Sequence, residues 1–187
     1  MSSDAEQVLT DLARTLDDLG VRWYLFGVQA ALLRGSRRLT ADVDVTVFLG
    51  PTRTEQLVSA LAAGGFPLRV PADDGFVART RVLPITHDAT RMPVDIVLGA
   101  PGIEEHFLSR SEVLTVGAAR IPTPLAEDLV VMKLLAGRDH DFEDAKALVK
   151  AGADLDDISS MVEAIADGLG EDDIRDALAE LRRRVTR

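Results

Sequence analysis

Three aspartates lie inside stretches whose other residues favour β-strands. Asp42 and Asp44 belong to residues 42–48, where polar residues alternate with valines, and alternation with a period of two is typical of a strand. Asp95 stands in the middle of a second apolar run, residues 93–98. Aspartate is depleted in strand interiors, so these three residues are candidates for a functional site.

The chemistry of these carboxylates depends on whether the two strands are neighbours. If they are, three carboxylates converge, and their repulsion is unfavourable unless a cation compensates it. Such oxygen ligands suit Mg²⁺ or Mn²⁺, and two such ions about 4 Å apart form the usual clamp for phosphoryl or nucleotidyl transfer. The alternative interpretation is structural: Asp42 would be a turn residue at a strand entry, and Asp44 would face solvent.

Residues upstream of the first two aspartates could bind a phosphate. Gly27 follows an aromatic, strand-like run and precedes a short helix-like segment. A glycine at such a turn lets a phosphate approach backbone N–H groups. Arg38 and Thr40 come directly before Asp42 and could reach the same pocket. The alternative interpretation is an ordinary turn glycine and a solvated basic loop.

Periodicity along the chain predicts two regions of different character. Strands are expected at residues 21–26, 42–48, 76–81, 82–86 and 92–98, with a short strand near residue 68 and a hairpin that turns at Gly117. Helices are expected at residues 3–19, 29–33, 51–63, 103–108, 125–135, 142–150, 155–166 and 174–185. The Ile-Pro-Thr-Pro segment at residues 121–124 is the best candidate for a linker.

We therefore predict an α/β (α+β) core over residues 1–121, with a mixed twisted sheet flanked by helices. A helical C-terminal region, residues 122–187, would pack on this core. The length of the chain suits one compact domain, or one core domain with a small appendage.

Composition excludes several classes of protein. The 187-residue chain has 31 acidic and 21 basic residues and a net charge of −10, which does not favour nonspecific binding to nucleic acid. It has no cysteine, which excludes a disulfide scaffold, a thiolate zinc site and a cysteine nucleophile and fits a reducing compartment. The longest near-apolar run, residues 23–33, is too short to span a bilayer, and the N-terminus does not resemble a signal peptide. We therefore expect a cytoplasmic protein with no membrane partner.

The first block of candidate residues resembles the nucleotidyltransferase superfamily with the DNA polymerase β-like fold. Proteins of this superfamily have a glycine-rich turn, a short helix, an Arg-x-Thr-x-Asp-x-Asp stretch and a third aspartate on a later strand. The matching residues here are Leu25 to Leu32 with Gly27, then Gly35, Arg38, Thr40, Asp42, Asp44 and Asp95. Among the branches of the superfamily, the chain is most similar to the abortive-infection type IV toxin nucleotidyltransferases, and next to small antibiotic nucleotidyltransferases.

A second block, residues 123–144, resembles the later helix pair of the same superfamily. By that resemblance, Lys133 contacts the nucleoside triphosphate, while Arg138, Asp141 and Asp144 help to hold the two helices and the lysine in place. Without the resemblance, the two aspartates would be ordinary charges in the first turn of a helix. Lys133 would then be a surface lysine, but its place on an otherwise apolar helix face argues against that interpretation.

The resemblance implies a metal-dependent nucleotidyltransferase that moves a nucleoside monophosphate from an NTP to a hydroxyl acceptor and releases pyrophosphate. Asp42 and Asp44 would hold two Mg²⁺ or Mn²⁺ ions, and Asp95 would bind one of them and act as general base. Lys133, with Arg38, would neutralise the leaving pyrophosphate. The acceptor would be RNA, a protein or a small molecule, and a toxin-like enzyme would also have an antitoxin protein as partner.

Two other functions are compatible with the sequence. The superfamily has a glycine or a serine after the first glycine of the phosphate turn, whereas this chain has Val28 after Gly27. Both residues would still offer backbone N–H groups to the triphosphate, but the change also suits a noncatalytic nucleotide sensor or interaction protein. A metal-dependent phosphohydrolase fits less well, because His87, His106 and His140 show no spacing typical of metal ligands.

Overall fold

The structure of this protein is a computed structural model that describes residues 3–36, 40, 42–70, 75–170 and 172–186. This part of the chain contains nine helices and six strands. In chain order they are α1 (Ser3–Leu19), β1 (Arg22–Phe26), α2 (Gly27–Leu33), β2 (Val43–Phe48), α3 (Thr54–Ala63), α4 (Phe76–Thr80), β3 (Val82–Thr86), β4 (Pro93–Leu98), α5 (Ile103–Arg110), β5 (Glu112–Val116), β6 (Ala119–Thr123), α6 (Ala126–Ala136), α7 (Asp139–Lys150), α8 (Leu155–Leu169) and α9 (Asp173–Thr186). None of the described helices is long and apolar enough to cross a bilayer.

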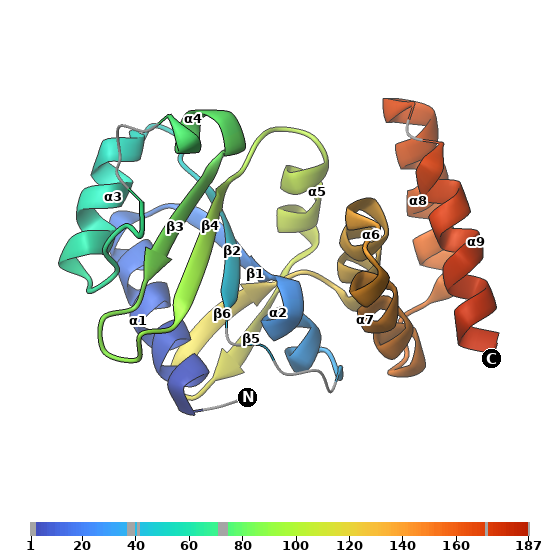
Figure 1. The fold of residues 1–187 in the computed structure, drawn as a ribbon, viewed down its shortest axis with the longest axis horizontal. Coiled ribbons are helices and arrows are strands. Elements are labelled where there is room, and N and C mark those ends of the chain that lie inside the picture. Colours follow the sequence, from blue (N-terminus) through green and yellow to red (C-terminus); the bar gives the residue numbers. More distant parts are fainter. Residues whose placement is uncertain (1–2, 37–39, 41, 71–74, 171, 187) are drawn as a thin grey trace. The chain divides into compact units, whose positions relative to one another are not determined.

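The main sheet has four strands in the order β1-β2-β4-β3, which can be followed across the strands in Figure 1. Strands β2 and β4 run parallel, whereas β1 pairs with β2, and β3 with β4, in antiparallel fashion. Strands β5 and β6 form a separate antiparallel hairpin. The predicted mixed sheet is therefore confirmed, and so are the flanking helices and the helical C-terminal part.

One face of the main sheet belongs to the hydrophobic core. The alternate positions of β2 and β4 that carry β-branched residues are fully buried. They are Val43, Val45, Val47, Val94 and Ile96. Helix α1 buries the apolar stripe that its periodicity predicts and contacts β1, β6 and α3. Because side chains alternate along a strand, Asp44 and Asp95 lie on the opposite face.

The expectation of a strand at residues 76–81 is wrong. These residues form the short helix α4, which follows Gly75 in a left-handed backbone conformation (φ +71°). Their backbone hydrogen bonds are local, such as the one from the N–H of Arg81 to the carbonyl of Val77 (2.8 Å). A short apolar run fits a strand and a helical turn equally well, and here the local bonds decide for the helix, none of whose residues is buried.

The expectation of a linker at residues 121–124 is also wrong for most of that segment. Ile121, Pro122 and Thr123 are strand residues of β6, where Ile121 pairs with Leu114 and Pro122 with Val113 of β5. Proline is tolerated there because a two-stranded hairpin consists of edge strands, where one N–H can be missing. The second strand of the hairpin therefore continues to Thr123, into the segment that was predicted to be a linker.

The chain divides into two compact units. Unit 1 comprises Met1–Gln29 and Leu39–Pro124, and unit 2 comprises Ala30–Arg38 and Leu125–Arg187. Helix α2 therefore begins in unit 1 and ends in unit 2. The predicted domain boundaries at residues 1–121 and 122–187 stay a prediction.

Unit 2 is organised around helix α6. This helix contacts α7, α8 and α9, which explains why its apolar residues are not confined to one stripe. Leu129, Val130, Val131 and Leu134 are all buried. A helix enclosed in this way leaves little room for charge, yet α6 carries Lys133 with a side chain that is only 10% exposed.

A buried ion cluster joins α6 to α7. The Nζ of Lys133 donates hydrogen bonds to Oδ1 of Asp141 and to Oδ2 of Asp144, both at 2.9 Å, and the two carboxylates are 0% and 1% exposed. Arg138 adds a hydrogen bond from Nε to Oδ2 of Asp141 (2.6 Å). Buried charges are tolerated when they are paired and hydrogen-bonded, and this cluster meets both conditions.

The ion cluster also fixes the protonation state of Asp141. Burial acts to raise the pKa of this carboxyl, but the hydrogen bonds and positive charges of Arg138 and Lys133 outweigh it and hold the pKa below its usual value. A group whose pKa is lower in the folded than in the unfolded state stabilises the fold above its unfolded pKa. This contribution is lost as the pH falls through the folded pKa.

We predict that Lys133→Met lowers the free energy of unfolding by about 3 to 5 kcal/mol at pH 7, because two buried carboxylates lose their shared cation. The loss should shrink as the pH falls below about 4, the unfolded pKa of aspartate, and through the lowered pKa of Asp141. Urea denaturation of both proteins at each pH measures the difference.

The matched control is Arg14→Met, which breaks the ion pair with Asp11 on α1. Because Arg14 is 65% exposed, its removal should cost less than about 1 kcal/mol and show little dependence on pH in this range. A Lys133→Met loss that is equally large at pH 7 and pH 3 would contradict the electrostatic role of the cluster.

Candidate active site

Asp44 and Asp95 lie side by side in unit 1. Strands β2 and β4 are parallel neighbours, and their register pairs Asp44 directly with Asp95. Neighbouring strands are about 4.8 Å apart, and paired positions share one face of the sheet. Two carboxylates from strands that are about fifty residues apart in sequence are thus brought to one place on the half-exposed face.

Gly27 lies directly against Asp44. It has a left-handed backbone conformation (φ +69°), and a Cβ built on it would lie 2.1 Å from Oδ2 of Asp44. Any side chain at this position would therefore displace the carboxylate. The end of β1, the start of α2 and the Asp44 side chain meet at this glycine, which explains why the turn needs it.

Asp42 precedes β2 and has a partner of its own. The hydroxyl of Thr40 donates a hydrogen bond to Oδ1 of Asp42, and Nε2 of Gln29 donates to the carbonyl of Thr40 (3.4 Å). Gln29 is 2% exposed, so this contact ties the approach to β2 to the first turn of α2. The predicted residue Arg38 lies outside the described residues.

Arg69 is a site residue that the sequence did not indicate. Its Nη2 donates to Oδ1 of Asp95, its Nε donates to the carbonyl of Ile85 (2.9 Å), and its backbone N–H donates to the carbonyl of Pro84 (2.8 Å). The pairing joins residues 26 positions apart, which no local pattern reveals. The sequence did predict a short strand near residue 68, and the structure has a single β-bridge there, between Leu68 and Ile85. Pairing that short strand with β3 would have placed Arg69 beside β3.

The donor atoms of this site suit a hard divalent cation. Carboxylate oxygens are the ligands that Mg²⁺ and Mn²⁺ prefer, and Gly27 leaves Asp44 the space that a Cβ would fill. Within the ranges that the structure describes, no three Asp, Glu, His or Cys side chains are grouped closely enough to bind one metal ion. The carboxylates of Asp42 and Asp95 are instead engaged by Thr40 and Arg69.

The remaining predicted residues lie elsewhere. Lys133, Arg138, Asp141 and Asp144 are together in the ion cluster of unit 2. Val28, directly after Gly27, is 7% exposed, so its side chain is part of the packed interior.

The histidines show no metal-site arrangement in the described residues. His87 is buried, with Nε2 3.3 Å from Oδ2 of Asp11 and Nδ1 3.0 Å from the hydroxyl of Thr90. Its ring also contacts that of Phe66, with centroids 4.8 Å apart. His87 therefore serves the packing of unit 1.

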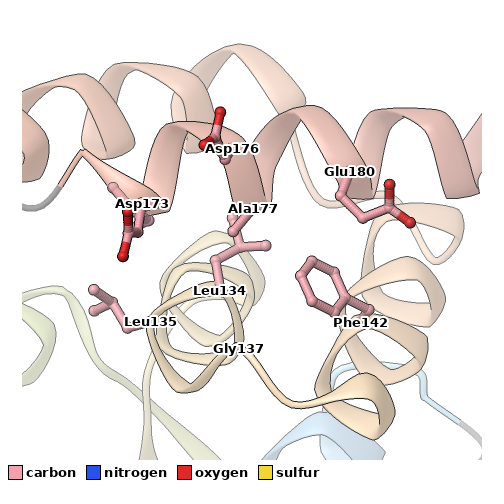
Figure 2. Close-up of a pocket in the computed structure, with 9 residues that line it drawn as sticks. Leu134, Leu135, Gly137, Phe142, Asp173, Asp176, Ala177 and Glu180 are labelled. Carbon is pink, nitrogen blue, oxygen red and sulfur yellow. The ribbon is translucent and has the colours of Figure 1, made fainter.

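Unit 2 also contains a hollow of about 470 Å³ between α6, α7 and α9. Figure 2 shows its apolar floor, to which Leu134 and Phe142 contribute, opposite Ala177 on α9. Asp173 and Glu180 lie towards the two ends of the lining stretch of α9. The residues that line the hollow include none of the described residues singled out from the sequence.

Comparison with known proteins identifies the fold. No family model matches the sequence, and no curated protein matches it either. The solved structures do match. A nucleotidyltransferase-like antigenic protein from Paracoccidioides brasiliensis has a TM-score of 0.62 and 17% identity, covering 98% of this chain and 89% of that chain.

Two enzymes that modify antibiotics are similar over most of their length. ANT(2'')-Ia, in complex with adenylyl-2''-tobramycin, has a TM-score of 0.55 and 14% identity, covering 98% of this chain and 99% of that one. The lincosamide antibiotic adenylyltransferase LnuA, lincomycin-bound, has a TM-score of 0.53 and 16% identity, covering 81% of this chain and 98% of that one. The resemblance to abortive-infection toxins stays a prediction, but this chain has the fold of the nucleotidyltransferases.

Proposed function

We propose that this protein is a metal-dependent nucleotidyltransferase. The observation that carries the proposal is the direct pairing of Asp44 with Asp95 on parallel strands, with Gly27 packed against Asp44 at a strand-to-helix turn. Two adjacent carboxylates on a half-exposed sheet face repel each other; Arg69 offsets part of this charge at Asp95, and a divalent cation would offset more of it. The similarity of fold to adenylyltransferases supports nucleotidyl transfer as the use of this site.

In this proposal Asp42 and Asp44 bind two divalent cations, Mg²⁺ or Mn²⁺, and Asp95 binds one of them. When bound, such ions polarise the α-phosphate and neutralise the charge that develops on the leaving oxygen. The protein would contribute the carboxylates, of which Asp44 and Asp95 are paired across β2 and β4. Thr40 would hold Asp42 in position through its hydroxyl, and Gly27 would keep the space around Asp44 clear.

The proposed reaction is an in-line displacement at the α-phosphorus of an NTP. The oxygen of the acceptor hydroxyl forms a bond to the α-phosphorus, and the bond from that phosphorus to the oxygen bridging to the β-phosphate breaks. The hydroxyl proton passes to Asp95 as general base, and pyrophosphate leaves. The product is the acceptor esterified with a nucleoside monophosphate.

A small hydroxylated molecule is the acceptor that the findings favour over RNA or a protein. Two proteins of similar fold are an adenylyltransferase with lincomycin bound and an enzyme in complex with adenylyl-2''-tobramycin. The net charge of −10 also disfavours a long polyanionic acceptor. A toxin-like activity on RNA or protein, with an antitoxin partner, is the alternative.

The roles of the remaining residues are part of the proposal. Gly27 and Val28 would offer backbone N–H groups to the triphosphate, and the contacts of Arg38 and Lys133 with its phosphates stay predictions. The alternative function, a noncatalytic nucleotide sensor, was suggested by Val28, which stands where the superfamily has a glycine or a serine. Because the Val28 side chain is buried, it fills interior space without removing the backbone donors of the turn, so it does not weigh against catalysis.

We predict that Asp44→Asn abolishes nucleotidyl transfer, with a fall of at least about 100-fold, because the metal loses a charged ligand where charge develops. Urea denaturation of the variant verifies that it is folded. The assay follows Mg²⁺-dependent transfer of label from each α-labelled NTP to lincosamides, aminoglycosides and the fractions of a cell extract.

Asp88→Asn is the matched control, because this aspartate is 57% exposed and pairs only loosely with Arg91 (3.8 Å). It should retain full transfer. Turnover that is unchanged in Asp44→Asn would contradict the proposal, and nucleotide binding without incorporation into any acceptor would favour the sensor.

We also predict that Gly27→Ala lowers transfer by about 100-fold, because the new Cβ would force Asp44 out of place and misplacement by about 1 Å has effects of this size. The same assay measures it, together with urea denaturation.

The control is Gly20→Ala. Gly20 has nearly the same backbone conformation (φ +70°) but nothing within 4 Å of an added Cβ. This variant should lose only about 1 to 2 kcal/mol of unfolding free energy from the left-handed conformation and should keep its activity. Equal activities of the two variants would show that the contact with Asp44 does not matter.

A further inference from the structure

Arg69 holds its guanidinium at a fixed place beside Asp95. The backbone is tied to β3 through the bond from its N–H to Pro84 (2.8 Å), and Nε is tied to the carbonyl of Ile85 (2.9 Å). With both anchors made, Nη2 reaches Oδ1 of Asp95. The cation is therefore positioned by β3 itself and does not depend on Asp95 to stay where it is.

The pairing with Asp95 supplies positive charge where two carboxylates meet. Asp95 is directly beside Asp44 in the register of the parallel strands. The ion pair is half-exposed, with side-chain exposures of 37% for Arg69 and 41% for Asp95, and exposed pairs of this kind are weak. A divalent cation carries twice the charge and would compete for the same carboxylate.

We propose that Arg69 is the counter-ion of Asp95 in the metal-free protein and that it competes with the metal for this carboxylate. The inference rests on the proposed function, because it concerns the proposed metal ligand Asp95. A metal ion bound to Asp95 must share this carboxylate with Arg69 or take it from Arg69, and in both cases the anchored guanidinium remains nearby as a positive charge that repels the ion. Arg69 thus weakens the binding of a free metal ion.

The same positive charge has the opposite effect on a nucleotide. A triphosphate brings several negative charges that attract the guanidinium and offset its repulsion of the metal. The site should therefore prefer the metal–NTP complex to the free ion, and Arg69 is a positioning residue that sets this preference. A supporting residue that only oriented Asp95 would act in the other direction, because loss of such partners weakens metal binding.

The test measures binding of Mn²⁺ alone, without nucleotide, by the electron paramagnetic resonance signal of the free ion. Arg69→Gln should bind Mn²⁺ about three- to ten-fold more tightly than the unaltered protein, as expected for loss of an exposed pair and of one nearby positive charge. Arg69→Lys keeps the charge and should bind like the unaltered protein. Arg69→Gln combined with Asp95→Asn should lose the gain.

Arg81→Gln is the matched control. Arg81 has the same architecture on the same sheet, with Nε donating to the carbonyl of Leu98 (2.9 Å) and Nη2 to Glu104 (2.6 Å), but it does not touch Asp95. Its Mn²⁺ affinity should stay within about two-fold of the unaltered protein, since net charge changes equally in both variants.

Each outcome decides the inference. Mn²⁺ binding by Arg69→Gln that is unchanged or weaker overturns the counter-ion role and leaves the proposed function standing. Equal tightening in Arg81→Gln also overturns it, because net charge alone would then explain the gain. Absence of Mn²⁺ binding in every variant, in the presence of NTP as well, overturns the metal site and the proposed function together. Circular dichroism of each variant verifies that it is folded.

Discussion

The adjacency of two carboxylates on parallel strands is the constraint on which the rest of unit 1 depends. Asp44 and Asp95 are brought together by the register of β2 and β4, and that register is fixed by the valines and isoleucine that fill the opposite face. A shift of either strand by one residue would exchange the two faces and bury the carboxylates. The core of unit 1 is therefore what holds two like charges in one place.

The residues next to these carboxylates accommodate their negative charge in three different ways. Gly27 gives Asp44 room by having no side chain, Thr40 binds Asp42, and Arg69 binds Asp95. In unit 2 the carboxylates are neutralised by a buried lysine. The Nζ of Lys133 donates hydrogen bonds to both Asp141 and Asp144. Asp95 in unit 1 is half-exposed, whereas the carboxylates of the ion cluster in unit 2 are buried.

Much of this architecture could be predicted from the sequence because it depends on local patterns. Alternating valines identified β2, and the 3.6-residue rhythm identified the helices of unit 2. The strand predicted at residues 76–81 was wrong because a short apolar run does not distinguish a strand from a helix. The linker predicted at residues 121–124 was wrong because β6 extends into this Pro-containing segment. The pairing of Asp44 with Asp95 was expected only if the strands were neighbours. Arg69 could not be found, since its role depends on a side chain that crosses β3 to reach a residue far along the chain.

The central claim is that the carboxylates of unit 1 bind divalent cations for nucleotidyl transfer. A crystal grown with Mn²⁺ and a nonhydrolysable NTP analogue, measured at the manganese absorption edge, tests this claim most directly. The account predicts anomalous peaks at about 2.1 Å from carboxylate oxygens of Asp42, Asp44 and Asp95, with the α-phosphate of the analogue as a further ligand. Manganese bound at other residues, or an analogue bound away from these aspartates, would contradict it.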